Sequence, residues 1–268
     1  AYVCAVHGFR VRLQDVSENA LRAARERIEA LLGESEAKGY IAPAQRERAL
    51  DLLSYHTDLA EAAADADLAI EAVPEEIELK IRVFRELDAV CPERAVLATN
   101  TSTLSPTEIG AGTSRPDRCI AMHFFNPVHK MKLVEIVRGL DTSDETYALT
   151  ESVARRLGKE TVRVNEFPGF VTSRLNALIG NEAMNMLMEG VASAEDIDKA
   201  VKLGLNHPMG PLELGDLVGL DVRLRNLEYL HRTLGEKYRP SPLLVKYVKA
   251  GRLGRKTGAG VYTYDKKQ

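Results

Sequence analysis

Residues 95–137 read AVLATNTSTLSPTEIGAGTSRPDRCIAMHFFNPVHKMKLVEIV, a stretch in which short apolar runs alternate with a polar segment. The runs 95–99, 119–124 and 133–137 have the length and the apolar character of strands. Between the first two, residues 105–108 read SPTE, a capping-box pattern with proline in the first helical turn. Strands that alternate with helices are typical of a parallel sheet covered by helices, so this stretch predicts an α/β fold.

The same alternation extends over residues 1–165. Further strands are predicted at 9–16, 68–73 and 161–164, and helices at 17–39, 75–90 and 144–157, with another helix starting at Pro43. We therefore expect a Rossmann-type, doubly wound parallel sheet in residues 1–165. Residues 1–7 have the pattern of the last turns of a helix that Gly8 ends. We expect the first strand of the sheet and its GxGxxG loop to precede Ala1.

After Pro168 the apolar residues follow a helical period. Helix starts are indicated at Ser193, Pro211 and Ser241, and the only further strand is predicted at 260–264. We expect an all-α second domain over residues 166–268. Its apolar stripes, 170–187 and 212–230, exceed what a small domain buries on itself, which predicts a homodimer through this domain. The glycines at 251–260 lack the Walker spacing and are assigned to turns.

Charge and composition exclude several classes of protein. The 36 Lys and Arg against 39 Asp and Glu give a formal net charge of -3, without the basic excess that nucleic-acid binding requires. No apolar run approaches the roughly 20 residues that cross a bilayer, so we expect no membrane partner. The three cysteines are odd in number and lack CxxC spacing, which fits a reducing compartment and no metal site. These features predict a cytoplasmic protein.

A histidine and a glutamate stand on two neighbouring predicted strands. Period-two alternation places His123 at the carboxyl end of the strand 119–124, the edge where open α/β sheets bind ligands. On the next strand, Glu135 shares one face with apolar residues. A buried carboxylate is costly unless it is paired, and His123 is a suitable partner. An imidazole that a carboxylate orients has the properties of a general base.

Two further polar residues follow predicted strands. Ser102 comes just after the strand 95–99, and because Ser105 already caps the next helix, the Ser102 hydroxyl is left to position a substrate oxygen. Asp15 ends the strand 9–16, where a carboxylate in dinucleotide-binding folds binds the adenosine ribose. An acidic residue at a strand end is also commonly a turn or helix cap. Both interpretations of Asp15 stay open.

Ordered motifs along the whole chain resemble the 3-hydroxyacyl-CoA dehydrogenase family, especially its bacterial 3-hydroxybutyryl-CoA type. They are Asp15, residues 75–80 (EEIELK), residues 100–102 (NTS), residues 123–127 (HFFNP), Glu135, residues 168–170 (PGF), residues 208–211 (PMGP) and residues 254–258 (GRKTG). The resemblance implies an NAD-dependent oxidoreductase of fatty acid metabolism. The reaction is the reversible oxidation of a (3S)-3-hydroxyacyl-CoA to the 3-ketoacyl-CoA.

The resemblance also implies roles for individual residues. In it, His123 is the catalytic base, Glu135 its partner and Ser102 a substrate-binding hydroxyl. The NAD site is lined by Asp15, Glu75, Lys80, Ser102, Asn126 and Lys256. Lys38 falls where the family places a contact to a CoA phosphate. Ser173 stands where the family often has asparagine, and it keeps a hydroxyl donor in the active site.

Two other functions remain as alternatives. A related NADP-linked hydroxyacid reductase would need a basic residue at the strand end that Asp15 occupies, and Asp15 repels a 2′-phosphate. A catalytically silent NAD- or CoA-binding or structural protein on the same scaffold is favoured by the lack of a glycine loop. Retention of His123, Glu135 and Ser102 argues against it. Turnover of acetoacetyl-CoA with NADH distinguishes the enzyme from the silent protein.

Overall fold

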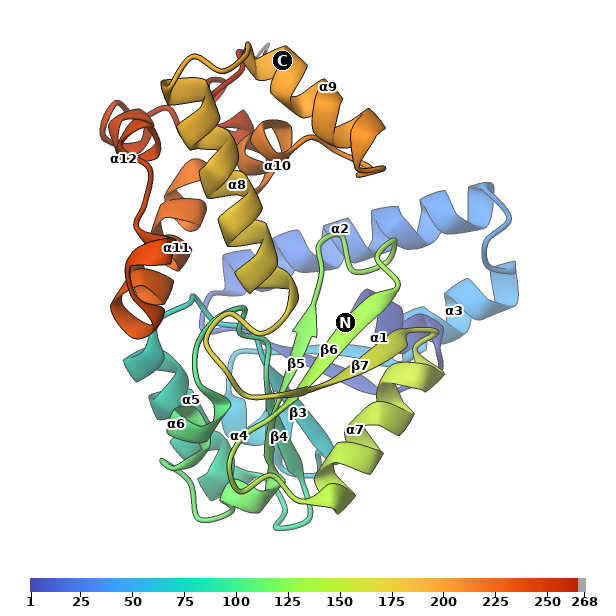
Figure 1. The fold of residues 1–268 in the computed structure, drawn as a ribbon. Helices are drawn as coiled ribbons and strands as arrows, with labels where there is room; N and C mark the ends of the chain where they lie inside the picture. Colours follow the sequence, from blue (N-terminus) through green and yellow to red (C-terminus); the bar gives the residue numbers. More distant parts are fainter. Residues whose placement is uncertain (265–268) are drawn as a thin grey trace. The chain divides into compact units, whose positions relative to one another are not determined.

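The structure is a computed structural model and describes residues 1–264. The chain forms two compact units, Ala1–Glu166 and Phe167–Gln268. The first unit is α/β and the second is helical, as expected from the change of sequence period (Figure 1). The predicted fold class, a Rossmann-type α/β domain followed by a helical domain, is confirmed.

The first unit contains seven strands in two sheets. The larger sheet has the order β3-β4-β5-β6-β7, and β1 pairs with β2 in a separate two-stranded parallel sheet. The strands are β1 (Val11–Gln14), β2 (Leu53–His56), β3 (Leu68–Glu71), β4 (Val96–Thr99), β5 (Cys119–Phe124), β6 (Leu133–Arg138) and β7 (Glu160–Asn165). The sequence analysis missed β2. No turn signal separates its four residues from the helix that starts at Pro43. The sequence therefore gives no indication that the helix ends before them.

The larger sheet is not parallel throughout. β3, β4 and β5 run parallel, but β6 pairs antiparallel with β5 and parallel with β7. The connection between β5 and β6, residues 125–132, contains no helix. A parallel pair needs a crossover of a dozen or more residues, so this short loop returns the chain antiparallel. The prediction of a parallel sheet is corrected at this one pairing.

Helices cover both faces of the larger sheet (Figure 1). They are α4 (Leu59–Ala63), α5 (Ile77–Val90), α6 (Pro106–Gly110) and α7 (Asp144–Arg156), while α1 (Tyr2–Val6), α2 (Glu18–Ala37) and α3 (Pro43–Asp51) accompany the smaller sheet. The predicted alternation is confirmed on β5: Cys119 joins the core with Phe84 and Leu87 of α5, whereas Ile120 joins the opposite core with Ala154 of α7. The predicted cap at Ser105 is also present, since its Oγ accepts a hydrogen bond from Glu108 N at 2.9 Å, whereas Ser241 starts α12 (Pro242–Lys249) without a side-chain capping bond.

The second unit consists of helices around one core. They are α8 (Thr172–Met188), α9 (Ala194–Gly204), α10 (Pro211–Val218), α11 (Leu220–Leu234) and α12 (Pro242–Lys249). The predicted stripe 212–230 is interrupted at Gly219, where φ is 108° and α10 gives way to α11. The predicted strand at 260–264 is wrong: this segment makes only isolated bridges. None of the helices within residues 1–264 is long and apolar enough to cross a membrane.

Two buried aspartates organise the glycine-rich end of this unit. Asp216 accepts hydrogen bonds from Val261 N and Tyr262 N, both at 2.9 Å. Its carboxylate thus takes the place of the acceptors that a neighbouring strand would provide. A Cβ at Gly254 or Gly260 would collide with Asp216, so the glycines permit close approach. Asp198 in turn accepts from the Tyr262 hydroxyl at 2.8 Å. The glycine cluster is therefore a closing turn, as its spacing indicated.

Two tyrosines of this closing segment make the stability of the protein sensitive to alkali. Burial and a hydrogen bond to Asp216 raise the pKa of Tyr264 to about 12, and burial with a hydrogen bond to Asp198 also raises the pKa of Tyr262. The unfolded chain releases these protons near pH ~10, whereas the folded unit keeps them. We expect the free energy of unfolding to fall as pH rises from about 10 towards 12, as measured by urea denaturation.

Tyr264→Phe should weaken this pH dependence. Tyr247→Phe is the control, because the Tyr247 hydroxyl makes no hydrogen bond within residues 1–264 and no comparable change is expected. A pH dependence that is equal in the wild type and in Tyr264→Phe would contradict the assignment.

Candidate active site

His123 and Glu135 form a buried pair at the carboxyl end of β5. The antiparallel register sets the two residues directly opposite each other, and His123 Nδ1 lies 2.7 Å from Glu135 Oε2. Glu135 is fully buried and His123 is 5% exposed. The predicted pairing is thus present in the structure. The carboxylate fixes the orientation of the ring and can stabilise an imidazolium, which is the arrangement a general base requires.

Glu75 organises the loop that carries Ser102. It lies just before α5, outside the helix that was predicted to include it. Its Oε1 accepts hydrogen bonds from the Thr101 hydroxyl at 2.6 Å, Ser102 N at 2.9 Å and Thr103 N at 3.2 Å. The Ser102 hydroxyl itself makes no hydrogen bond within residues 1–264. Glu75 therefore holds the loop backbone while the hydroxyl of Ser102 stays available to a ligand.

Lys80 is a correction to the predicted cofactor site. Its side chain exposes no surface, and its Nζ lies 2.8 Å from Glu71 Oε1 and 3.5 Å from Glu75 Oε2. A side chain that is fully enclosed in this way has no surface left for direct contact with a cofactor.

Asn100 connects the Ser102 loop to the strand of the base. Its Oδ1 accepts a hydrogen bond from Phe124 N, next to His123, at 3.0 Å. Sequence reasoning missed this contact and the supporting roles of Glu71, Thr99 and Thr101. The available signal was their position: a charged residue in the buried strand 68–73 and a run of polar residues at the end of 95–99.

The remaining predicted residues of the first unit lie near strand or helix ends. Asp15 follows β1, and its Oδ1 accepts a hydrogen bond from Ser17 N at 2.9 Å, as in the capping alternative. Its Oδ2 makes no hydrogen bond within the described part of the chain. Asn126 is exposed after β5. Lys38 ends α2 and lies 3.6 Å from Glu34.

Ser173 and Lys256 belong to the second unit. Ser173 is half-buried in the first turn of α8. Lys256 Nζ lies 2.5 and 2.7 Å from the two carboxylate oxygens of Asp221, near the start of α11. This ion pair involves a lysine that is 46% exposed, so its cation remains accessible to an anionic ligand.

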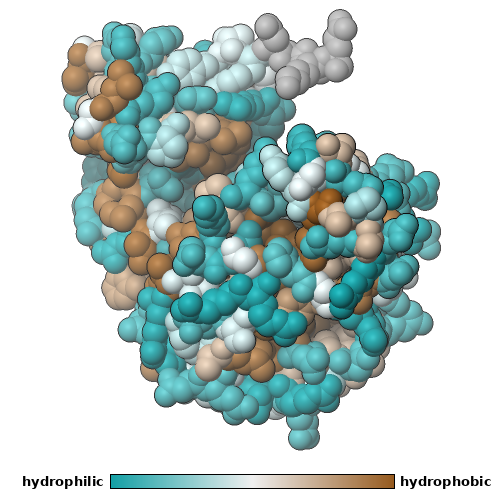
Figure 2. All heavy atoms as spheres, turned by 90° about the vertical axis from the view of Figure 1, so that its right-hand side faces the viewer, coloured by the Kyte–Doolittle hydropathy of each residue, from teal (hydrophilic) through white to brown (hydrophobic). Residues whose placement is uncertain are grey.

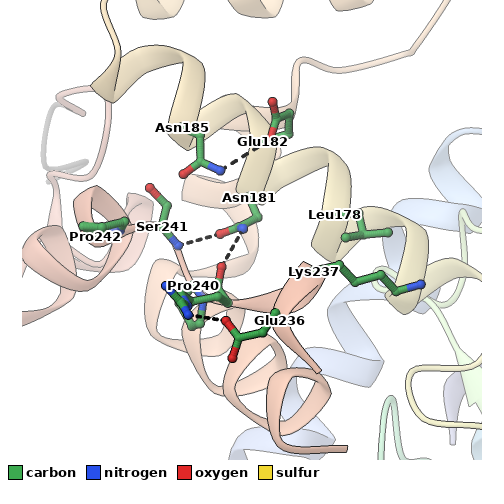
Figure 3. A pocket seen from close by; sticks show the side chains of 10 residues that line it. Leu178, Asn181, Glu182, Asn185, Glu236, Lys237, Pro240, Ser241 and Pro242 are labelled. Atoms are coloured by element: carbon green, nitrogen blue, oxygen red, sulfur yellow. Dashed lines mark hydrogen bonds and ion pairs between the residues drawn. The ribbon is translucent and has the colours of Figure 1, made fainter. Parts of the chain in front are cut away.

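A cavity of about 350 Å³ in the second unit contains none of the predicted site residues. It lies between α8 and the segment before α12, and Asn181 bridges its wall by donating to Arg239 O and accepting from Ser241 N (Figure 3). No group of three His, Cys, Asp or Glu within residues 1–264 could hold a metal ion.

Comparisons with known proteins find relatives along the full length of the chain. The probable 3-hydroxybutyryl-CoA dehydrogenase of Bacillus subtilis is 47% identical over 268 residues, which cover 100% of this chain and 93% of that protein. The corresponding probable enzyme of Deinococcus radiodurans is 45% identical over 98% of this chain and 95% of its own length. The crystal structure of (S)-3-hydroxybutyryl-CoA dehydrogenase from Ralstonia eutropha matches with a TM-score of 0.94 and 42% identity, covering 99% of this chain and 94% of that one.

Family descriptions divide the chain in the same place as the fold does. Residues 1–167 match the NAD-binding domain of 3-hydroxyacyl-CoA dehydrogenase, and residues 169–264 match its C-terminal domain. Together with the full-length relatives, these matches assign NAD as the cofactor and the two units as the two domains of one enzyme type. The chain belongs to the 3-hydroxyacyl-CoA dehydrogenase family.

Proposed function

We propose that this chain oxidises (3S)-3-hydroxybutyryl-CoA to acetoacetyl-CoA and catalyses the reverse reduction, with His123 as the general base. The observation that carries the proposal is the buried His123–Glu135 pair at the ligand-binding edge of the sheet. The names of the relatives support a short acyl chain. The proposal also places the protein in the cytoplasm and gives it a role in fatty acid metabolism.

The donor set of the first unit fits NAD. Asp15 has one carboxylate oxygen engaged by Ser17 N, which leaves the other to accept from a ribose hydroxyl. Asn126 is exposed at the same end of the unit as His123, and Glu75 adds a second carboxylate. The bound cofactor supplies the acceptor for the hydride that leaves C3.

The protein residues handle the proton and the oxygen. His123 accepts the proton of the C3 hydroxyl as the C3–H bond breaks and the C=O bond forms, and Glu135 stabilises the resulting imidazolium. The hydroxyl of Ser102 orients the substrate oxygen, since Glu75 holds the backbone beneath it. In the second unit, Ser173 offers a half-buried hydroxyl and Lys256 an ammonium on a side chain that is 46% exposed. Lys38, with an exposed side chain, contacts a phosphate of CoA.

The first prediction tests the base. His123→Ala should lower kcat for acetoacetyl-CoA reduction by about 10²–10⁴-fold, because the proton donor of the reverse reaction is lost. Glu135→Gln should have a smaller effect in the same direction. KM for NADH should stay within about twofold, as checked by steady-state absorbance at 340 nm.

His129→Ala is the matched control, because His129 is an exposed imidazole on the loop that follows β5. It should keep near wild-type kcat. Near-normal turnover of His123→Ala would remove His123 from the mechanism.

The second prediction concerns cofactor choice. Asp15→Ala should raise KM for NADH by about tenfold or more, because a hydrogen bond to a charged group is worth about 1.5–3 kcal/mol. It should also reduce the preference for NADH over NADPH, since the repulsion of a 2′-phosphate is removed. Glu18→Gln, at an exposed carboxylate at the start of α2, is the control and should leave both ratios unchanged. An unaltered NADH preference in Asp15→Ala would refute the ribose contact.

A homodimer through the second unit is part of the proposal. Large apolar side chains of this unit stay exposed in the single chain, as Figure 2 shows in brown on the face that it draws. They include Val171, Leu175, Met188, Val191, Leu203, Leu205, Leu217 and Val218. Contiguous exposed apolar surface marks protein interfaces, and we propose that these side chains contribute to such a surface. We expect a largely apolar interface of more than ~1,200 Å² in total.

The third prediction tests this interface. Light scattering at micromolar concentration should return twice the mass of the chain. Leu205→Glu, at a position that is 66% exposed, should shift the protein towards the monomer because a charge would be buried in the interface. Val16→Glu, at a residue of the first unit that is 89% exposed, should leave the dimer intact. A wild-type mass equal to one chain would argue decisively against the dimer.

A further inference from the structure

Glu71 is a buried carboxylate that no step of the reaction uses. It ends β3 and is 4% exposed, and it receives three donors. Val73 N donates to its Oε1 at 2.7 Å, and the Thr99 hydroxyl donates to its Oε2 at 2.7 Å. The ammonium of Lys80, which is also buried, donates to Oε1 at 2.8 Å. Together, these three contacts hold the Glu71 carboxylate in one orientation.

Lys80 is held between two carboxylates at unequal distances. Its Nζ is 2.8 Å from Glu71 and 3.5 Å from Glu75, and it also donates to Val73 O at 3.3 Å. The ammonium of Lys80 therefore lies closer to Glu71 than to Glu75. The Lys80 ammonium attracts Oε2 of Glu75. Oε1 of Glu75 therefore accepts hydrogen bonds from the backbone N–H groups of residues 102 and 103.

Stability alone does not account for such an arrangement. Replacing a buried ion pair by well-packed apolar side chains is often neutral or stabilising, so a buried pair is weak evidence for a stabilising role. The pair does define a geometry, because Lys80 is fully buried and Glu71 is 4% exposed. From Lys80 the contacts continue to Glu75 at 3.5 Å and from Glu75 to the backbone of the Ser102 loop at 2.9 Å.

We propose that Glu71 is a positioning residue of the active site: by holding Lys80 away from a close contact with Glu75, it keeps the Glu75 carboxylate in place under the loop that presents Ser102. This inference rests on the proposed function, in which Ser102 orients the substrate oxygen. In Glu71→Gln, the uncompensated Lys80 is drawn to Glu75 and competes with the loop donors. The loop then loses its anchor.

The kinetic test compares Glu71→Gln with the wild type. We expect kcat to fall about tenfold, which is about 1.4 kcal/mol of barrier height, while KM for NADH changes by less than about twofold. In a Ser102→Ala background, Glu71→Gln should have little further effect on kcat, because its action passes through Ser102. Equal losses in both backgrounds would overturn the proposal.

Thr99→Val provides a second variant of similar shape. It removes one donor to Glu71 without removing a charge, so it should fold and should lower kcat by about threefold in the same direction. Glu86→Gln, at an exposed position of the same helix α5, is the matched control and should match the wild type. Normal kcat in both Glu71→Gln and Thr99→Val would also overturn the proposal.

Amide hydrogen exchange gives a readout that does not depend on turnover. Ser102 N and Thr103 N are protected by Glu75 in the wild type, and Glu71→Gln should speed their exchange about tenfold or more while leaving the β5 amides unchanged. Unchanged exchange at residues 102 and 103 would contradict the inference even if the protein had no dehydrogenase activity. Failure of the wild type to reduce acetoacetyl-CoA would instead refute the proposed function.

Discussion

The antiparallel pairing of β5 with β6 is the constraint on which the site depends. It sets Glu135 opposite His123, and a shift of β6 by one residue would turn Glu135 to the other face of the sheet, away from His123. Because Glu135 has no exposed surface, it needs a partner for its charge, and the register supplies His123 at 2.7 Å. The alternating residues Ile120 and Met122 fill the opposite core, so hydrophobic burial fixes the same register. Packing of the core and placement of the His123–Glu135 pair thus require the same register of β5 and β6.

Carboxylates take the place of regular secondary structure wherever the chain leaves it. Glu75 gathers the loop after β4, and Glu166 accepts from the backbone and the hydroxyl of Thr107. Asp216 does the same for the closing segment of the second unit. Each loop leaves backbone N–H groups that would be costly to bury without partners, and a carboxylate accepts several of them at once.

The two units also differ in where their polar groups lie. In the first unit, the buried polar residues Glu71, Lys80, His123 and Glu135 lie around the Ser102 loop and the base, whereas Thr142, Thr150 and Lys159 donate to backbone carbonyls elsewhere. In the second, Asp198 and Asp216 bind backbone and tyrosine hydroxyls at the end of the chain. A buried polar group needs a hydrogen-bond partner in either unit. In the first unit, those hydrogen bonds also position side chains that can contact a substrate.

The sequence by itself determined most of the element types, the helix caps at Ser17, Ser105 and Ser193, and the pairing of His123 with Glu135, because period, capping residues and burial of charge are local properties. It also carried the motifs of the family. The tertiary structure alone decided what depends on segments far apart in the chain. It showed that β6 reverses direction, that 260–264 is a turn built on Asp216, and that Lys80 is enclosed between Glu71 and Glu75. No local pattern reports such contacts, since a lysine one turn into a helix has the same sequence signature whether it points to solvent or to a buried carboxylate.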